Sequence, residues 1–194
     1  MNNVVRGREK YYIYFKITNK ITKYIKILPL NFRKKLFSMF QGTHGLIGIG
    51  IRYVLIKSIA KKCGENVSIH SNVYIFKPEN LVLGSNVSVH PMSYIDSTGQ
   101  IEIGNDVSIA HGVTILSSSH NFSSYTLPIK DQGISLNETI IENNVWLGAK
   151  STILSGISIK ENSIVGASSV VTKTHNKGDI IIGVPGKAIK KVNK

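Results

Sequence analysis

Apolar residues recur every six positions between Val67 and Val171, and this period constrains the fold more than any other feature of the 194-residue sequence. A period of six is too short for a pair of helices and fits a short extended segment followed by a corner. A second apolar column runs two residues ahead of the first, as expected where alternate side chains of a strand point inward. The first column consists of Ile69, Ile75, Leu83, Val89, Ile95, Ile103, Ile109, Ile115, Ile141, Leu147, Ile153, Ile159, Val165 and Val171.

Small polar residues and glycines precede many of these units. Asn, Asp and Gly tolerate the positive φ that a tight corner requires, so the pattern predicts flat sides joined by sharp corners. Three six-residue sides would make a triangular coil of about 18 residues. The predicted corner residues are Asn66, Asn72, Asn80, Asn86, Asp106, Gly112, Asn144, Gly156 and Asn162.

The period is interrupted at three corresponding positions. Short insertions follow Ile75 and Ile95, and a long loop, 116–138, follows Ile115. Because these positions are one expanded coil apart, all three insertions should leave the same edge of the prism. A long excursion from a compact coil is usually functional or disordered, so we expect this edge to build a site.

From about residue 64 to residue 190 the sequence resembles the hexapeptide-repeat acyltransferases, and it is most similar to the maltose, galactoside and capsule O-acetyltransferase branch. The resemblance implies a mainly β fold, a left-handed parallel β-helix of hexapeptide repeats over residues 63–190. It also implies a homotrimer and acetyl-CoA as donor substrate, with no metal required. The handedness rests on the resemblance alone, since parallel crossovers are usually right-handed.

Residues 1–62 form a separate, basic region. They hold 14 of the 24 Lys and Arg residues and a single acidic residue, Glu9, so 14 − 1 gives the whole formal charge of +13. Apolar residues at helical spacing predict a first helix that ends at Pro29. Its apolar residues are Tyr11, Tyr14, Phe15, Ile17, Ile21, Tyr24, Ile25 and Leu28. Lys16, Lys20 and Lys23 are expected on another face. Asn31 is the predicted cap of a second helix, and a third is expected from about Leu46 to Lys62.

The partner of this basic helical appendage is open between two alternatives. Basic helices with an aromatic apolar face suit an anionic membrane surface, which makes residues 1–41 a candidate for peripheral membrane contact. Alternatively, the apolar faces cover the end of the β-helix or a trimer partner. No nucleic-acid motif accompanies the charge, so nucleic acid is not an expected partner.

We expect the protein to be cytoplasmic, either free or attached at the inner face of the cell membrane. Cys63 is the single cysteine, so no disulfide framework is available, and it is expected to be a packed thiol. No secretory segment is visible, and the apolar stretch 45–56 is interrupted by Arg52 and too short to span a bilayer.

The candidate catalytic residue is His120, in the long loop. In the branch that the sequence resembles, the histidine base ends a Thr-x-x-x-x-x-His run that leaves the coil, and here this run joins Thr114 to His120. A neutral imidazole can accept the proton of an attacking sugar hydroxyl. The resemblance places the amide that stabilises the oxyanion just after a Trp-x-Gly element, which identifies the Ala149 N–H. The loop serines 117, 118, 119, 123 and 124 are interpreted as flexible polar residues.

Three further residues are candidate acceptor contacts. Trp146, the only tryptophan, occupies an outward position, where it could pack in a trimer or line the cleft between subunits. His90 takes a position where sugar acetyltransferases often carry an acceptor-binding asparagine, and His70 should stack one coil beneath it. Asp96 lies near the start of the loop and could orient His120 or bind a sugar hydroxyl.

The C-terminal part resembles the cofactor-binding end of the family. The resembling segments are 166–173 and 182–190. By position, the pantetheine arm of CoA would lie along Gly148, Ala149, Ala167 and Thr172, and the phosphates would face Lys173, Lys187 and Lys190. Lysine provides a point charge for phosphate without the two-pronged geometry of arginine.

The sequence therefore predicts an acetyl-CoA-dependent O-acetyltransferase that acts on a carbohydrate hydroxyl, in surface polysaccharide synthesis. One alternative is an N-acetyltransferase of an amino sugar or nucleotide sugar, with the same fold and donor. Another is a non-enzymatic, membrane-docked scaffold. A γ-class carbonic anhydrase shares the coil, but His90, His111 and His120 do not reproduce its three-histidine metal spacing.

Overall fold

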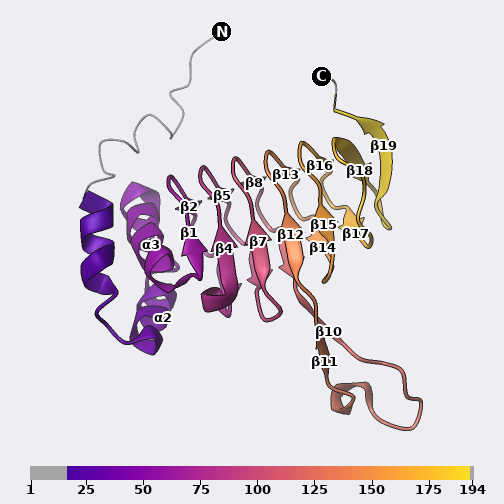
Figure 1. The fold of residues 1–194 in the computed structure, drawn as a ribbon, viewed down its shortest axis with the longest axis horizontal. Helices are drawn as coiled ribbons and strands as arrows, with labels where there is room; N and C mark the ends of the chain where they lie inside the picture. The colour runs from indigo at the N-terminus through magenta and orange to yellow at the C-terminus, as the bar shows by residue number, and fades with distance from the viewer. Residues whose placement is uncertain (1–16, 193–194) are drawn as a thin grey trace.

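The computed structural model describes residues 17–192, which form a helical cap followed by a parallel β-helix (Figure 1). The cap contains helical residues 17–25, α2 (Leu30–Met39) and α3 (Gly45–Ile59). Among the described residues, no helix has the length and apolar content needed to cross a bilayer.

Three sheets form the sides of the β-helix, and the chain visits them in a fixed rotation. Their strands are parallel except for β19, which pairs antiparallel with β18. Sheet A contains β1 (Lys62–Cys63), β4 (Leu81–Leu83), β7 (Ile101–Ile103), β12 (Thr139–Ile141) and β15 (Ser158–Ile159). Sheet B contains β2 (Ser68–Ile69), β5 (Ser88–Val89), β8 (Ser108–Ile109), β13 (Trp146–Leu147), β16 (Ile164–Val165), β18 (Asp179–Ile182) and β19 (Lys187–Lys191). Sheet C contains β3 (Tyr74–Phe76), β6 (Tyr94–Asp96), β9 (Thr114–Leu116), β14 (Thr152–Ile153) and β17 (Val170–Val171).

The predicted apolar column fills the interior of the prism. Ile69, Val89 and Ile109 pair in register on sheet B, and none of the three has any exposed surface. Each aliphatic side chain therefore stacks on its equivalent in the next coil, and burying it stabilises the fold by about 1.5–3 kcal/mol. This confirms the prediction of a β-helix from the six-residue period.

The corners have the predicted backbone conformation, with one exception. Positive φ occurs at Asn66, Asn72, Asn86, Asp106, Gly112, Asn144, Gly156 and Asn162. The prediction for Asn80 is wrong, because Asn80 ends the short 3-10 helix η1 (Pro78–Asn80) and the positive φ falls on Lys77 instead. The corner side chains also bond along the prism, since the Asn66 amide donates to Asn86 and the Asn86 amide donates to Asp106.

All three insertions leave the edge between sheets C and A, as predicted. The Ser97 N–H donates to Phe76 O, the Ser117 N–H donates to Asp96 O, and the Asn137 N–H donates back to Ser117 O. The long insertion extends from this edge as a two-stranded antiparallel ribbon of β10 (Ser118–His120) and β11 (Ile134–Leu136), with the 3-10 helix η2 (Ile129–Asp131) near its tip (Figure 1).

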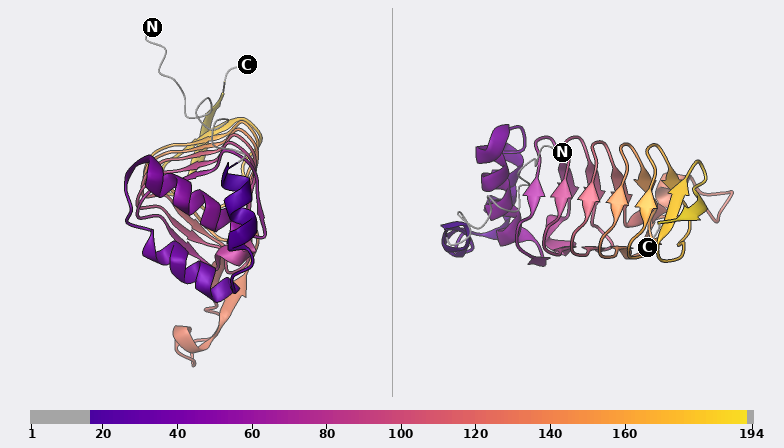
Figure 2. Two further views of the ribbon diagram at one scale, coloured as in Figure 1. Left: turned by 90° about the vertical axis from the view of Figure 1, so that its left-hand side faces the viewer. Right: turned by 90° about the horizontal axis from the view of Figure 1, so that it is seen from above.

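The three helices of the cap cover the first coil, and Figure 2 shows them lying across the end of the prism. Tyr53, Ile56 and Ile59 of α3 join the same apolar core as the inward column. Asn31 does not cap α2, because the helix begins at Leu30 and Pro29 occupies the cap position. The third helix ends at Ile59, before the predicted end, and β1 begins at Lys62. Predicted helical residues Tyr11, Tyr14, Phe15 and Lys16 lie outside the described part of the chain.

Arg52 fastens the cap to the coil. Its guanidinium is fully buried and donates to Phe40 O (2.9 Å), Thr43 O (2.6 Å) and Ile69 O (2.9 Å). These carbonyls belong to the end of α2, the turn before α3 and the first coil. One side chain therefore joins three segments that meet at the end of the prism.

Candidate functional site

The base of the ribbon is organised around Asp96. This carboxylate is buried on β6 and accepts hydrogen bonds from the hydroxyls of Ser118 and Thr98 and from the Thr98 N–H. Burial opposes ionisation of Asp96, but these hydrogen bonds outweigh it and hold the pKa of the carboxyl below its usual value. Asp96 therefore anchors the ribbon at the residue two positions before His120.

Two of the loop serines are structural, so their interpretation as flexible residues is wrong. Ser117 is fully buried; its hydroxyl donates to Asp96 O and accepts from the Gly99 N–H. Ser118 donates to the Asp96 carboxylate. The chain thus leaves the coil through a hydrogen-bonded junction.

His120 occupies the outer end of β10. Its side chain is exposed, and its backbone is opposite Ile134 in the ribbon. The ribbon beyond it is held by Asn121, which donates to Gln132 O and accepts from Ser135. His120 is therefore an exposed imidazole on a supported strand, placed outside the body of its own prism.

The corner between sheets B and C carries the candidate oxyanion amide. Around it, the Gly148 N–H donates to Val165 O and the Lys150 N–H donates to His111 O. The Ala149 N–H donates to no acceptor among the described residues, and neither does the Ala167 N–H at the equivalent corner of the next coil. Adjacent strands lie about 4.8 Å apart, so the two free donors lie about one strand spacing from each other.

Gly148 has a packing role that does not depend on any ligand. A Cβ at this position would lie 2.6 Å from the Ala167 N and 2.7 Å from Val165 O. Glycine is therefore required for the two coils to approach each other here.

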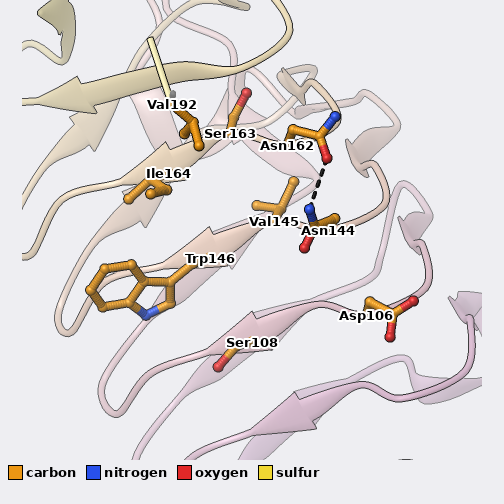
Figure 3. A pocket seen from close by; sticks show the side chains of 9 residues that line it. All are labelled: Asp106, Ser108, Asn144, Val145, Trp146, Asn162, Ser163, Ile164 and Val192. Carbon is orange, nitrogen blue, oxygen red and sulfur yellow. Dashed lines mark hydrogen bonds between the residues drawn. The ribbon is translucent and has the colours of Figure 1, made fainter. Parts of the chain in front are cut away.

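Trp146 projects outward from sheet B, as predicted, and half of its surface is exposed. Figure 3 shows the indole beside a hollow of about 240 Å³, with Ile164 and Val192 from the following elements on its other side. The polar side of the hollow is formed by Asp106, Ser108, Asn144, Asn162 and Ser163. Within it, the Asn144 amide donates to Asn162 Oδ1 (2.8 Å). The hollow combines an aromatic wall with amide and hydroxyl groups.

His90 stacks on His70, as the repeat arithmetic predicted. The ring centroids are 4.6 Å apart and the planes differ by 12°. Burial lowers the pKa of both imidazoles; the nearby His111 adds to this effect at His90, and His90 and Arg52 add to it at His70. The stack lies at the corner between sheets B and C, two coils before Ala149.

The C-terminal candidates are divided between two places. Thr172 and Lys173 follow β17 and are exposed near the edge from which the ribbon leaves. Lys187 and Lys190 are exposed on β19, which pairs antiparallel with β18 at the end of sheet B.

Within one protomer the predicted site residues therefore form two separate sets. The first lies along the C–A edge and contains Asp96, His120, Thr172 and Lys173. The second lies on sheet B and its corner with sheet C, and contains His90, Trp146, Gly148, Ala149, Ala167, Lys187 and Lys190. In a triangular prism, sheet B is the side opposite the C–A edge. A single protomer does not bring the histidine to the free amide.

Neither a metal centre nor a cysteine nucleophile is present in the part of the chain that the structure describes. No three His, Cys, Asp or Glu side chains gather there into a group that could hold a metal. Burial raises the pKa of the Cys63 thiol to about 12, and only the thiolate is an effective nucleophile.

Sequence reasoning missed the residues that support the ribbon. Gln132 accepts from the Ser124 N–H and donates to Ser124 O and Leu127 O, which ties the tip together. A glutamine in a polar loop carries no signal of such a role, because the partners are brought together only by the antiparallel pairing of β10 and β11.

Comparison with known proteins gives a consistent result. Residues 138–173 match the model of a family described as bacterial transferase hexapeptide (six repeats). Galactoside O-acetyltransferase from Escherichia coli (strain K12) is 31% identical over 150 residues, which cover 73% of this chain and 69% of that protein. A galactoside acetyltransferase solved in complex with coenzyme A superposes with a TM-score of 0.75 at 30% identity, covering 83% of this chain and 79% of that one. A maltose O-acetyltransferase from Clostridium difficile 630 shares the fold, with a TM-score of 0.75 at 24% identity over 88% of this chain and 89% of that one.

Proposed function

Because this chain belongs to the hexapeptide-repeat acetyltransferases, we propose that it transfers the acetyl group of acetyl-CoA to a carbohydrate hydroxyl, with His120 as general base. The observation that carries the proposal is the exposed imidazole on an anchored ribbon, in a fold that also offers an unpaired Ala149 N–H. A base and an oxyanion donor are the two groups that acyl transfer from a thioester requires.

The proposed reaction proceeds in two steps. His120 accepts the proton of the acceptor hydroxyl while its oxygen attacks the thioester carbonyl, and the Ala149 N–H donates to the resulting oxyanion. Collapse of the tetrahedral intermediate breaks the carbon–sulfur bond. The CoA sulfur leaves as thiolate and takes the proton from the imidazolium, which returns His120 to its neutral form.

The active unit would be a homotrimer, because the two sets of site residues lie on different sides of one prism. His120 of one protomer would face sheet B of a neighbour, with Trp146 and His90 as acceptor contacts. The pantetheine arm would run past Gly148, the free amides of Ala149 and Ala167, and Thr172. Lys173, Lys187 and Lys190 would bind the CoA phosphates.

We place the acceptor in surface polysaccharide synthesis. WbbJ of Escherichia coli (strain K12), which is named as a lipopolysaccharide biosynthesis O-acetyl transferase, is 37% identical over 75 residues, covering 39% of this chain and 38% of WbbJ. The basic N-terminal region, residues 1–41, would hold the enzyme against the inner face of the membrane, beside lipid-linked glycans. This location supports a glycan acceptor over a free sugar.

The test is acetyl transfer from labelled acetyl-CoA to a panel of glycans and amino sugars. His120→Ala should lower turnover about 10²–10⁴-fold, whereas His44→Ala, which alters an exposed histidine of the cap, should leave it unchanged. Wild-type turnover by a folded His120→Ala protein would refute the assignment. Acetylation of amines in place of hydroxyls would favour the amino-sugar N-acetyltransferase, and no transfer to any acceptor would favour the scaffold.

Subunit mixing tests the shared site. His120→Ala and Trp146→Ala change different sets, so a mixed trimer can assemble one cleft that carries neither change. Co-expression of the two variants should give more activity than either variant alone. Activity no higher than that of the better single variant would contradict a site shared between protomers.

A further inference from the structure

The first helix of the cap exposes most of its apolar side chains, although Ile25 packs against the core. Thr22 is only 5% exposed and its hydroxyl donates to Thr18 O, so the polar threonine side faces the rest of the cap. On the opposite side of the helix and the turn after it, Ile17, Ile21, Tyr24 and Ile27 are between 44% and 79% exposed. We call these four residues the outer stripe. These side chains form an apolar surface that none of the described residues covers.

Lysines lie on the same exposed side. Positions 17, 20, 21 and 24 fall on one face of a helix, so Lys20 shares the face of the outer stripe and Lys23 lies beside it. The prediction of a separate lysine face is therefore wrong for Lys20. Both lysines are exposed. Among residues 17–192, no carboxylate forms a salt bridge with either of them, whereas Lys34 on α2 pairs with Glu79. The charge that accompanies the outer stripe is therefore not neutralised within the described part of the protein.

We propose that the outer stripe docks on the surface of an anionic lipid bilayer. Apolar side chains would enter the boundary between headgroups and acyl chains while the lysines reach the anionic headgroups, the arrangement typical of interfacial helices. Charge complementarity selects this partner, since the ten basic residues of 17–62 are accompanied by no acidic residue. This inference narrows the membrane contact proposed above to one surface, and it does not depend on acetyl transfer.

The fold gives this contact a definite orientation. The helices of the cap cover one end of the prism, and the ribbon leaves from its side (Figures 1 and 2). Docking through the outer stripe would therefore place the cap at the bilayer and direct the coils away from it.

The experiment is co-sedimentation of the full-length protein with vesicles of phosphatidylcholine alone or with about one third phosphatidylglycerol, at low and high salt. The paired change Lys20→Gln with Ile21→Asn removes one lysine and one isoleucine from the outer stripe. The matched control, Ile129→Asn with Lys130→Gln, removes the same residue types from the ribbon tip, where Ile129 is 58% exposed.

We expect the wild type to bind the anionic vesicles and to lose binding as salt rises, because a charge contact is screened. The paired change in the outer stripe should weaken binding about tenfold or more, since it removes one cation that would reach the anionic headgroups and one apolar side chain that would enter the acyl boundary. The control should bind like the wild type.

Three results would overturn the proposal. The first is that the full-length protein does not bind anionic vesicles at low salt. The second is equal loss of binding in the control and in the outer-stripe variant. The third is a change of oligomeric state in the outer-stripe variant by light scattering, which would identify the stripe as a contact between copies of this chain. Unchanged thermal unfolding of both variants shows that the comparison concerns folded proteins.

Discussion

The coils of the β-helix bury their inward apolar side chains, whereas the first helix of the cap exposes most of its apolar side chains. Ile103 and its equivalents are wholly inside the prism, whereas Ile27 is 79% exposed at the turn after the first helix. In the coils, every inward position has a partner one turn away, so the chain supplies its own cover. The outward residues of the cap helix have no such neighbour among the described residues. Hydrophobic patterning thus identifies an apolar face, but it does not say which surface covers that face.

The two regions also differ in charge. Residues 63–194 hold ten basic and ten acidic residues, and residues 1–62 hold the entire net charge of +13. In the coils, Glu142 and Lys160 form an ion pair within a neutral surface. Residues 17–62 contain no acidic residue, so their positive charges repel one another except where a carboxylate of the coils lies close, as Glu79 does to Lys34.

The largest expected difference between the regions is in stability. Ile103→Ala should lower the free energy of unfolding by about 2–5 kcal/mol, because it leaves a cavity between stacked coils. Ile27→Ala should change it by less than about 0.5 kcal/mol. Chemical denaturation of both variants measures the difference. A comparable loss at Ile27 would show that the outer stripe is covered in the free protein.

Arg52 tests how firmly the two regions are joined. Arg52→Met keeps much of the buried volume but removes the donors to three carbonyls, so we expect a loss of about 1.5–3 kcal/mol in unfolding free energy. Lys35→Met, on the exposed side of α2, serves as the control and should have little effect. If Arg52→Met unfolds like the wild type, the cap is held by apolar contacts alone.

The corners should show a smaller effect. Asn86 has φ of +59° and bonds to the corner residues of both neighbouring coils. Asn86→Ala should cost about 1–2 kcal/mol, because alanine is disfavoured at positive φ. Asn86→Gly removes the backbone penalty and retains only the loss of the side-chain bonds, so it should be the milder change. Denaturation curves in which glycine is the worse substitution would contradict this account.

The smallest predicted effect is a dependence of stability on pH. Burial lowers the pKa of His70 and His90 in the folded state, below the unfolded value of about 6.5. The folded protein then binds fewer protons than the unfolded chain, so the stabilisation is complete above about pH 6.5 and is lost as pH falls toward the folded pKa values. His90→Asn should reduce the fall in unfolding free energy between pH 7.5 and 5.5. If the unfolding free energy of His90→Asn depends on pH as that of the wild type does, the histidine stack is not the cause of the dependence.

The sequence was sufficient to predict the coils because their order is local and repeated. A side such as Ser88–Val89 needs only an inward aliphatic residue and a corner residue that accepts positive φ, and both can be read from six consecutive positions. The error at Asn80 arose where the repeat is interrupted and Pro78 starts a short helix. The direction in which Ile17 and Ile21 face was not predictable, since it depends on the packing of Thr22 against the rest of the cap.

The positions of the candidate residues in the repeat were predictable one by one, but their arrangement in space was not. His120 and Trp146 follow from their places in the repeat and from the resemblance. They lie on opposite sides of one prism because the chain passes through three sheets in turn, and the side that each residue occupies is known only once its strand is assigned to a sheet. The ordered junction at Ser117 and Ser118 depends on Asp96, more than 20 residues earlier in the chain, and nothing in a run of serines indicates that contact.

The last strand has a consequence for assembly. A stack of parallel coils ends in unpaired strand edges, and such edges can template the addition of another chain. At one end α3 lies over the first coil, and at the other β19 runs antiparallel to β18, against the direction of every coil before it. A second molecule could not continue the winding across a strand of the wrong polarity. On sheet B, the reversed strand therefore opposes end-to-end growth of the solenoid into filaments.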